Sequence, residues 1–145
     1  MHKFLTNLVL IVALGLPAAT VAQTADGPKA IVERGVSAYL KGDAAAAMRE
    51  WVKGSFMESN PQAMSQANSL RQIEDFYGKP QGYDLVKEAT ITPRAKTVYF
   101  TLNFERGIAF ARLNAYRKDD GTWITTSLFF HTEAPQVFPS SLLGE

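Results

Sequence analysis

The alternation of apolar and polar residues between positions 95 and 131 predicts three antiparallel strands. A period of two places successive side chains on opposite faces of a sheet. Turn segments at Arg106-Gly107 and at residues 118–121 separate the three alternating stretches. Residues 83–93, which end at Pro93, form a less regular fourth candidate. The pattern therefore predicts a four-stranded meander. The apolar face of its clearest strand carries Val98, Phe100, Leu102 and Phe104.

The turns also predict a register. A two-residue turn at Arg106-Gly107 pairs Glu105 with Ile108, and pairing Arg117 with Thr122 carries the apolar face on through Ile124, Leu128 and Phe130. The opposite face would then be aromatic and polar. Its members are Tyr99, Asn103, Phe110, Arg112, Asn114, Tyr116, Trp123, Thr125, Ser127, Phe129 and His131.

Before the strands, apolar residues recur every three or four positions, which is the period of a helix packed on one side. Asp43 is a suitable N-cap, and Asn60 followed by Pro61 is a second helix start. Gly78 provides a C-terminal stop. We therefore expect helices over residues 28–41, 44–56 and 61–77. The buried stripes of the last two would hold Met48, Trp51, Val52, Ser55 and Phe56, and Ala63, Met64, Ala67, Leu70, Ile73 and Tyr77.

These elements predict an α+β fold, in which about three N-terminal helices pack on one face of a curved four-stranded antiparallel meander sheet. The isolated Gly35 and Gly54 would lie inside helices and mark close packing. The polar residues 65–68 fit either the rim of a pocket or an exposed helix face.

The first 22 residues are typical of a signal peptide, because a basic start at Lys3 precedes a mostly apolar run that ends in small residues. An uncleaved membrane anchor is the alternative. Cleavage predicts a periplasmic or secreted protein without a membrane segment. Its parts would be a flexible start at residues 23–28, one domain over residues 29–133, and a C-terminal tail, residues 134–145, that packs on the domain.

Charge and composition exclude several kinds of chemistry. Lys3 is the only Lys, Arg, Asp or Glu in residues 1–22, so the mature chain would have 14 basic and 14 acidic residues, a balance that does not favour nucleic-acid binding. Cysteine is absent, which excludes disulfides, thiolate zinc sites and cysteine nucleophiles. His131 is the single histidine after the leader and lacks a second metal ligand at a suitable spacing. We therefore expect no metal, no cofactor and no assigned catalytic residue.

The aromatic face of the sheet is the main candidate for an interface, because Tyr, Trp, Phe and Arg are enriched in interface cores. Its candidate residues are Tyr99, Phe110, Arg112, Tyr116, Trp123, Phe129 and His131. We expect a homodimer, with a protein partner or a small apolar ligand as other possibilities. The alternative is that the tail, with Val137, Phe138, Leu142 and Leu143, folds back over part of this face.

The order of helices before a long meander resembles the nuclear transport factor two-like superfamily of cone-shaped α+β domains. The resemblance covers residues 28–131 and includes the aromatic end of the third helix, Phe76-Tyr77, and the turn between Tyr116 and Trp123. It implies a cavity between helices and sheet, and a dimer on the outer sheet face. The extra hairpin common in that family has no room between Met57 and Pro61.

Three functions are compatible with this sequence. The leading hypothesis is an exported, non-enzymatic binding domain that dimerises through the aromatic sheet face. The second is a small isomerase- or hydrolase-like enzyme, because enzymes of the resembled fold often place an Asp, His or Tyr inside the cone; its pocket candidates are Tyr39, Trp51, Asp75 and Tyr77. The third is a single helix-pair module of the tetratricopeptide type, formed by residues 42–78.

Overall fold

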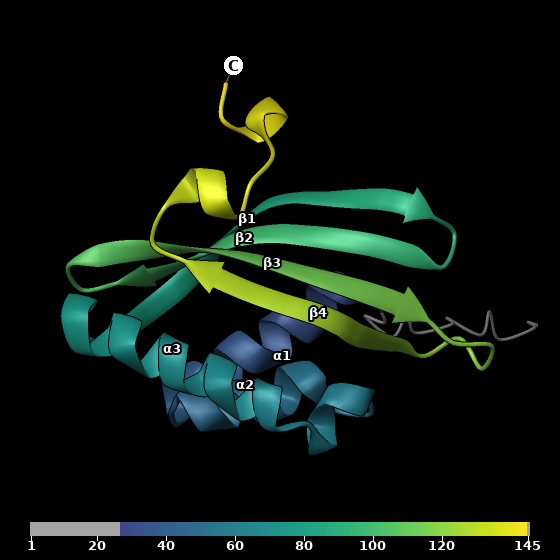
Figure 1. Cartoon of the computed structure of the whole chain (residues 1–145), viewed down its shortest axis with the longest axis horizontal. Helices are drawn as coiled ribbons and strands as arrows, with labels where there is room; N and C mark the ends of the chain where they lie inside the picture. Colours follow the sequence, from purple (N-terminus) through teal and green to yellow (C-terminus); the bar gives the residue numbers. More distant parts are fainter. Residues whose placement is uncertain (1–26, 145) are drawn as a thin grey trace, which may run out of the picture.

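The computed structural model describes residues 27–144, which form three helices followed by a four-stranded antiparallel sheet (Figure 1). This confirms the predicted fold class. The helices cover one face of the sheet, and the C-terminal tail lies on the other face (Figure 1). The predicted signal peptide and residues 23–26 lie outside the described residues. The helices are α1 (Pro28–Lys41), α2 (Ala44–Val52) and α3 (Pro61–Tyr77), and the strands are β1 (Pro80–Thr92), β2 (Ala95–Phe104), β3 (Gly107–Arg117) and β4 (Trp123–His131).

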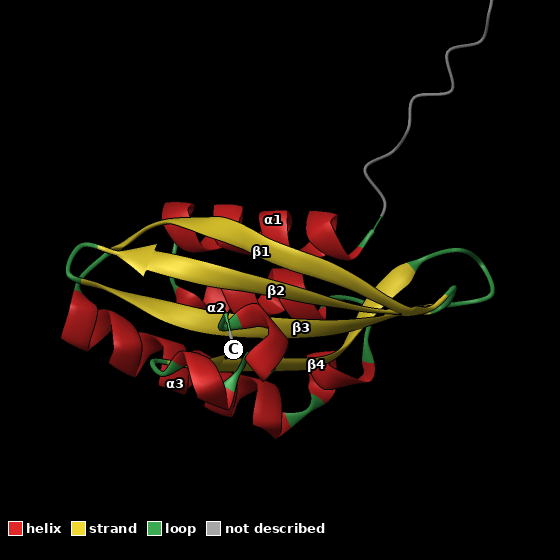
Figure 2. Ribbon diagram, turned by 90° about the horizontal axis from the view of Figure 1, so that it is seen from above, coloured by secondary structure: helices red, strands yellow, loops and turns green. Residues whose placement is uncertain are grey.

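The strands follow one another in the sheet in the order β1-β2-β3-β4, so β1 and β4 are the two edges. Seen from above, α1 lies along the β1 side and α3 along the β4 side (Figure 2). Since residues 95–131 form strands and their turns, the helix-pair hypothesis is not supported. No helix within residues 27–144 has the length and apolar character needed to cross a membrane.

The predicted helix caps are confirmed. The carboxylate of Asp43 accepts a hydrogen bond from the amide of Ala46 at 2.7 Å, and the side chain of Asn60 accepts one from Gln62 at 2.9 Å. Each bond satisfies an amide that has no partner within its helix. Gly78 ends α3 with a φ of 87°, a conformation that L side chains rarely adopt.

The second helix ends earlier than predicted. It stops at Val52, and Gly54, with a φ of 73°, lies in the following turn and not inside the helix. The hydroxyl of Ser55 donates to the carbonyl of Val52 and accepts from the amide of Met57, which starts a short 3-10 helix, Phe56–Ser59. This turn buries Met57 and leaves Phe56 65% exposed, so the predicted burial of Phe56 is wrong. Met64 is likewise exposed, because the buried stripe of α3 is narrow.

The register of the β2–β3 hairpin differs by two residues from the prediction. The turn is Glu105-Arg106, and Phe104 pairs with Gly107. A shift of two residues leaves every side chain on its predicted face, because the sheet has a period of two. Gly107 belongs to the strand, and a Cβ atom there would lie 2.3 Å from the ring of Tyr77. The glycine therefore permits the close approach of α3. The sequence pattern instead predicts that this glycine is part of the turn.

A bulge in β4 changes the face of its first residues. Arg117 pairs with Trp123 and not with Thr122, and the register shifts between Ala115 and Asn114. Thr125 is consequently buried under the helices, where its hydroxyl donates to the backbone carbonyl of Trp51. Trp123 shares this helix-covered face and packs against the core, so its predicted place on the outer face is wrong.

Trp51 lies at the centre of the core and is 1% exposed. Its ring centroid lies 5.4 Å from that of Phe130, and its indole N–H donates to the carbonyl of Val32 at 3.2 Å. A Cβ atom on Gly35 would lie 2.0 Å from the indole nitrogen. Gly35 therefore allows α1 and α2 to pack closely, as its position in the sequence predicts.

Candidate binding groove along the sheet edge

Core side chains fill the space that the resemblance assigns to a cavity. Tyr39 and Trp51 are almost completely buried, and Tyr77 packs on Gly107 at the edge of the core. Asp75 is exposed on α3. The four pocket candidates therefore do not surround one cavity. Of three surface hollows on residues 27–144, none is lined by Tyr39 or Trp51.

A partly buried polar contact in this region joins Tyr39 and Glu74. The Tyr39 hydroxyl donates to a carboxylate oxygen of Glu74 at 3.0 Å. Burial raises the pKa of Tyr39 well above its usual range, and the neighbouring Glu74 carboxylate raises this pKa further. The phenol consequently stays protonated and serves as a hydrogen-bond donor between α1 and α3.

The C-terminal tail occupies the middle of the outer sheet face. Phe138 is 7% exposed, and its ring makes edge contacts with Tyr99 and Phe110 at centroid distances of 5.7 and 5.3 Å. Val137 beside it is also buried. The protein's own tail thus covers Tyr99 and Phe110, two of the predicted interface residues. This arrangement matches the alternative prediction, in which the tail folds back over part of this face.

The other predicted interface residues on this face lie on the two neighbouring strands β3 and β4, where Arg112 and Phe129 are direct cross-strand partners. Arg112 lies in the middle, and its buried Nε has no hydrogen-bond partner within the described part of the chain. Tyr116, 39% exposed, lies toward the other end of β3. Phe129 and His131 stack on each other along β4 with a centroid distance of 6.3 Å, and the His131 Nδ1 accepts from the Glu133 amide at 3.0 Å. With Tyr99 and Phe110 under the tail, only part of the predicted interface is open.

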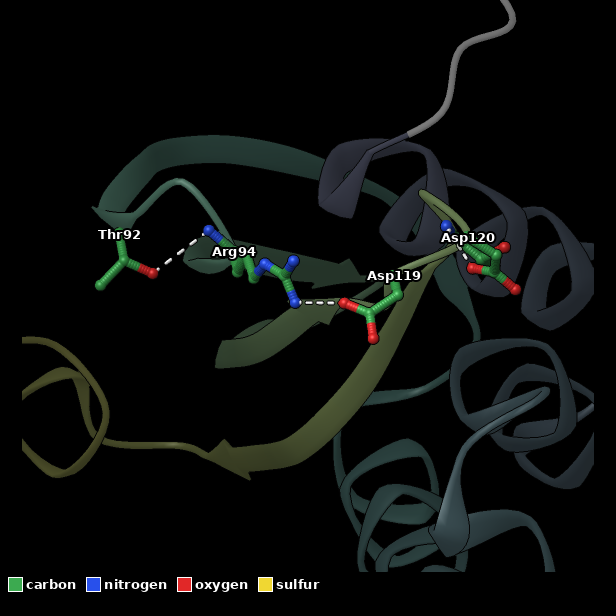
Figure 3. A network of polar contacts seen from close by, with 5 residues as sticks. Thr92, Arg94, Asp119 and Asp120 are labelled. Atoms are coloured by element: carbon green, nitrogen blue, oxygen red, sulfur yellow. Dashed lines mark hydrogen bonds and ion pairs between the residues drawn. The ribbon is translucent and has the colours of Figure 1, made fainter.

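Charged residues meet at the tips of the two hairpins (Figure 3). Arg94, from the β1–β2 turn, pairs with Asp119 of the β3–β4 loop, and both side chains are exposed. Within that loop, the Thr122 amide donates to Asp120 at 2.9 Å, a bond that lowers the pKa of the Asp120 carboxyl. An exposed pair of this kind adds little stability. The network ties the two loops together and contains no enclosed site.

Two hollows lie on the β4 side of the helical layer. One of about 260 Å³ and one of about 490 Å³ follow each other between α3 and β4, and both are lined by Gln66. Together we call them the β4 groove. The first is lined by Phe56, Met57, Asn60, Gln62, Ser65, Gln66, Thr126, Ser127 and Leu128, and the second by Gln66, Ser69, Gln72, Ile73, Phe76, Tyr77, Phe129, Phe130, His131 and Thr132.

The β4 groove is lined without a single Asp, Glu, Lys or Arg. Amide and hydroxyl side chains of α3 line its helix side, and exposed rings lie at its two ends, Phe56 and Phe76, the latter 73% exposed. A third hollow, of about 540 Å³ on the outside of α1 and α2, is lined by Glu33, Arg34, Lys41 and Glu50 among others. The absence of charge is therefore a property of the β4 groove and not of the helical layer in general.

The strand that borders this groove has one unpaired edge. β4 pairs with β3 alone, so alternate residues direct a backbone N–H and C=O away from the sheet. The arrangement thus combines three features in one place: unpaired backbone groups, neutral hydrogen-bonding side chains and exposed aromatic rings.

The sequence pattern does not single out this groove as the site. Residues 65–68 fit a pocket rim, and two of them, Ser65 and Gln66, do line it. The remaining signal is the run of Gln and Ser on one side of α3, which also fits an ordinary exposed helix. No group of three or more His, Asp or Glu within residues 27–144 could hold a metal ion.

Comparison of this chain with protein-family models, curated proteins and solved structures gave no match.

Proposed function

We propose that this chain is an exported binding domain that acts without catalysis and holds its partner on the outside of the fold, in the β4 groove. The observation that carries the proposal is the coincidence of an unpaired strand edge with a neutral, aromatic-ended groove. The packing beneath the sheet supports it too, because Trp51 is 1% exposed, packs against Phe130 and lines neither hollow of the groove. Large exposed apolar side chains beside a concave surface often mark contact sites.

The proposal is tested by mapping small neutral probes on the ¹⁵N-labelled protein. Phenol and N-methylacetamide represent an aromatic side chain and a peptide group without carrying charge. We expect their chemical-shift changes to cluster at the β4 groove, around Gln66 and His131. Changes that cluster on the outer face around Tyr116, or that scatter over the surface, would contradict this location.

Self-association through the outer sheet face is a second candidate. It is favoured by Arg112, whose buried Nε lacks a partner within residues 27–144 and could bond to a second copy after a tail movement. With Phe138 in place, the open part of the face is reduced, whereas a stable interface needs roughly 800 Å² from each partner. Light scattering tests this candidate. A dimer that Arg112→Glu or Tyr116→Glu dissociates supports it, and a monomer unaffected by either change contradicts it.

A further inference from the structure

We propose that the β4 groove binds an uncharged, extended polypeptide segment, which adds to the sheet as a fifth strand beside β4. This inference rests on the proposed function and names the class of its ligand. Strand addition uses backbone hydrogen bonds for affinity and the flanking side chains for selectivity. Both components are present at this edge of the sheet and are absent in that combination at the other edge.

The two edges differ in how readily they accept a strand. β1 has three register shifts against β2, and Lys87 and Glu88 are part of it. Bulges and charged residues are the usual means of preventing pairing at an edge. β4 has one register shift, at Thr126, and its remaining residues through His131 keep a regular register with β3. A regular edge strand of this kind can accept a new strand along its length.

The dimensions of the groove fit a short peptide. From Thr126 to Thr132 the strand side spans about 20 Å at about 3.3 Å per residue. From Gln62 to Phe76 the helix side spans about 21 Å at 1.5 Å per residue. The two sides match, and an extended segment of about seven residues has the same length.

The chemistry of the lining selects against charge in the ligand. A Lys or Glu side chain that entered the groove would gain no opposite charge from an acidic or basic side chain, since neither hollow is lined by Asp, Glu, Lys or Arg. Gln66, Ser69 and Gln72 offer both donors and acceptors, which match the amide groups of a peptide backbone and of uncharged polar side chains. Phe56 and Phe76 add apolar contact at the ends.

A single extended segment fits this edge better than a second folded copy. α3 lies along the β4 side of the helical layer, below the sheet (Figures 1 and 2). A copy that paired β4 with β4 would bring its own α3 into the same space. An isolated peptide has no helix beneath it and can lie on the Gln and Ser side chains of α3.

The test uses capped, fluorescently labelled heptapeptides that alternate valine with Ser, Gln, Thr and Asn. We expect the uncharged peptide to bind with a dissociation constant below about 1 mM, and the version N-methylated at its three central amides to bind at least about tenfold more weakly. A version with Glu and Lys in place of Gln and Thr should also lose about tenfold. Equal binding of the N-methylated peptide would overturn strand addition, and no binding at about 1 mM would overturn the peptide as ligand.

Two variants of α3 provide the matched control. Gln66→Lys introduces a charge where the two hollows meet, whereas Asn68→Lys introduces the same charge on the same helix at a position that lines neither hollow. We expect Gln66→Lys to weaken the uncharged peptide at least about tenfold and Asn68→Lys to leave its affinity within about twofold. An equal loss in both variants, or formation of a dimer in place of a peptide complex, would overturn the proposal.

The neutral probes and the peptides together separate the two proposals. If the probes cluster in the groove but the peptides fail, the ligand class is wrong and the proposed function stands. If the probes do not cluster there, the proposed function itself fails.

Discussion

At the residue scale, the most demanding position is Gly35, where α1 meets the indole of Trp51. A methyl group there would overlap the ring, because its carbon would lie 2.0 Å from the indole nitrogen. We expect Gly35→Ala to lower the free energy of unfolding by about 1–3 kcal/mol, despite the better helix propensity of alanine. Urea denaturation measures this change. Arg34→Ala, on the exposed side of the same helix, is the control, and an equally stable Gly35→Ala variant would contradict the assigned packing.

Thr125 makes the second critical contact, with the carbonyl of Trp51 near the end of α2. Thr125→Val keeps the shape and removes the donor, so a buried carbonyl loses its side-chain partner. The expected loss is about 1–3 kcal/mol in the free energy of unfolding. Thr126→Val removes an exposed hydroxyl that donates to the carbonyl of Asn114, and should cost less than about 0.5 kcal/mol. Similar losses in both variants would argue against the special role of Thr125.

Tyr39 makes stability depend on pH on the alkaline side. Its pKa is raised in the folded protein, so above the ordinary tyrosine pKa of 10.0 the unfolded chain releases this proton and the folded chain does not. The contribution of Tyr39 to the free energy of unfolding is complete below pH 10.0. It is lost as the pH rises above this value, by up to about 1.4 kcal/mol per pH unit. Tyr39→Phe should flatten this part of the stability profile. An unchanged alkaline slope in the variant would contradict the assigned environment.

At the scale of elements, the sequence predicts what depends on local pattern. The limits of α1 and the caps at Asp43 and Asn60 follow from propensities and from side chains that bond within a few residues. The faces of β2 and β3 follow from alternation. The register of their hairpin does not, because Gly107 has the same sequence signal whether it serves a turn or a close contact with Tyr77. Likewise, the bulge that redirects Trp123 depends on tertiary packing of Thr125 under α2.

The tail is an element whose position also depends on distant contacts. Phe138 covers Tyr99 and Phe110, which lie on two neighbouring strands. We expect Phe138→Ala to lower the free energy of unfolding by about 3 kcal/mol and to increase the binding of an apolar dye, because two rings become accessible. Leu143→Ala, farther along the tail, should do neither. Unchanged stability and dye binding in Phe138→Ala would contradict the packing of the tail.

At the scale of the whole molecule, the β4 groove forms where α3 of the helical layer meets the β4 edge of the sheet. The helical layer buries the inner face of the sheet, and α3, with its narrow apolar stripe of Ala63, Ala67 and Leu70, leaves its Gln and Ser side chains beside β4. This relation joins residues about sixty positions apart in the sequence, such as Gln66 and Ser127. The sequence could predict each side of the groove as a polar surface, but not that the two would meet.

The most direct test of the central claim is the set of intermolecular nuclear Overhauser effects in the complex with the uncharged heptapeptide. Strand addition predicts a regular series of contacts between peptide backbone protons and those of β4 from Ser127 to His131, together with side-chain contacts to Gln66 and Phe76. Contacts confined to the outer face around Arg112 and Tyr116, or a saturated complex without backbone contacts to β4, would contradict it.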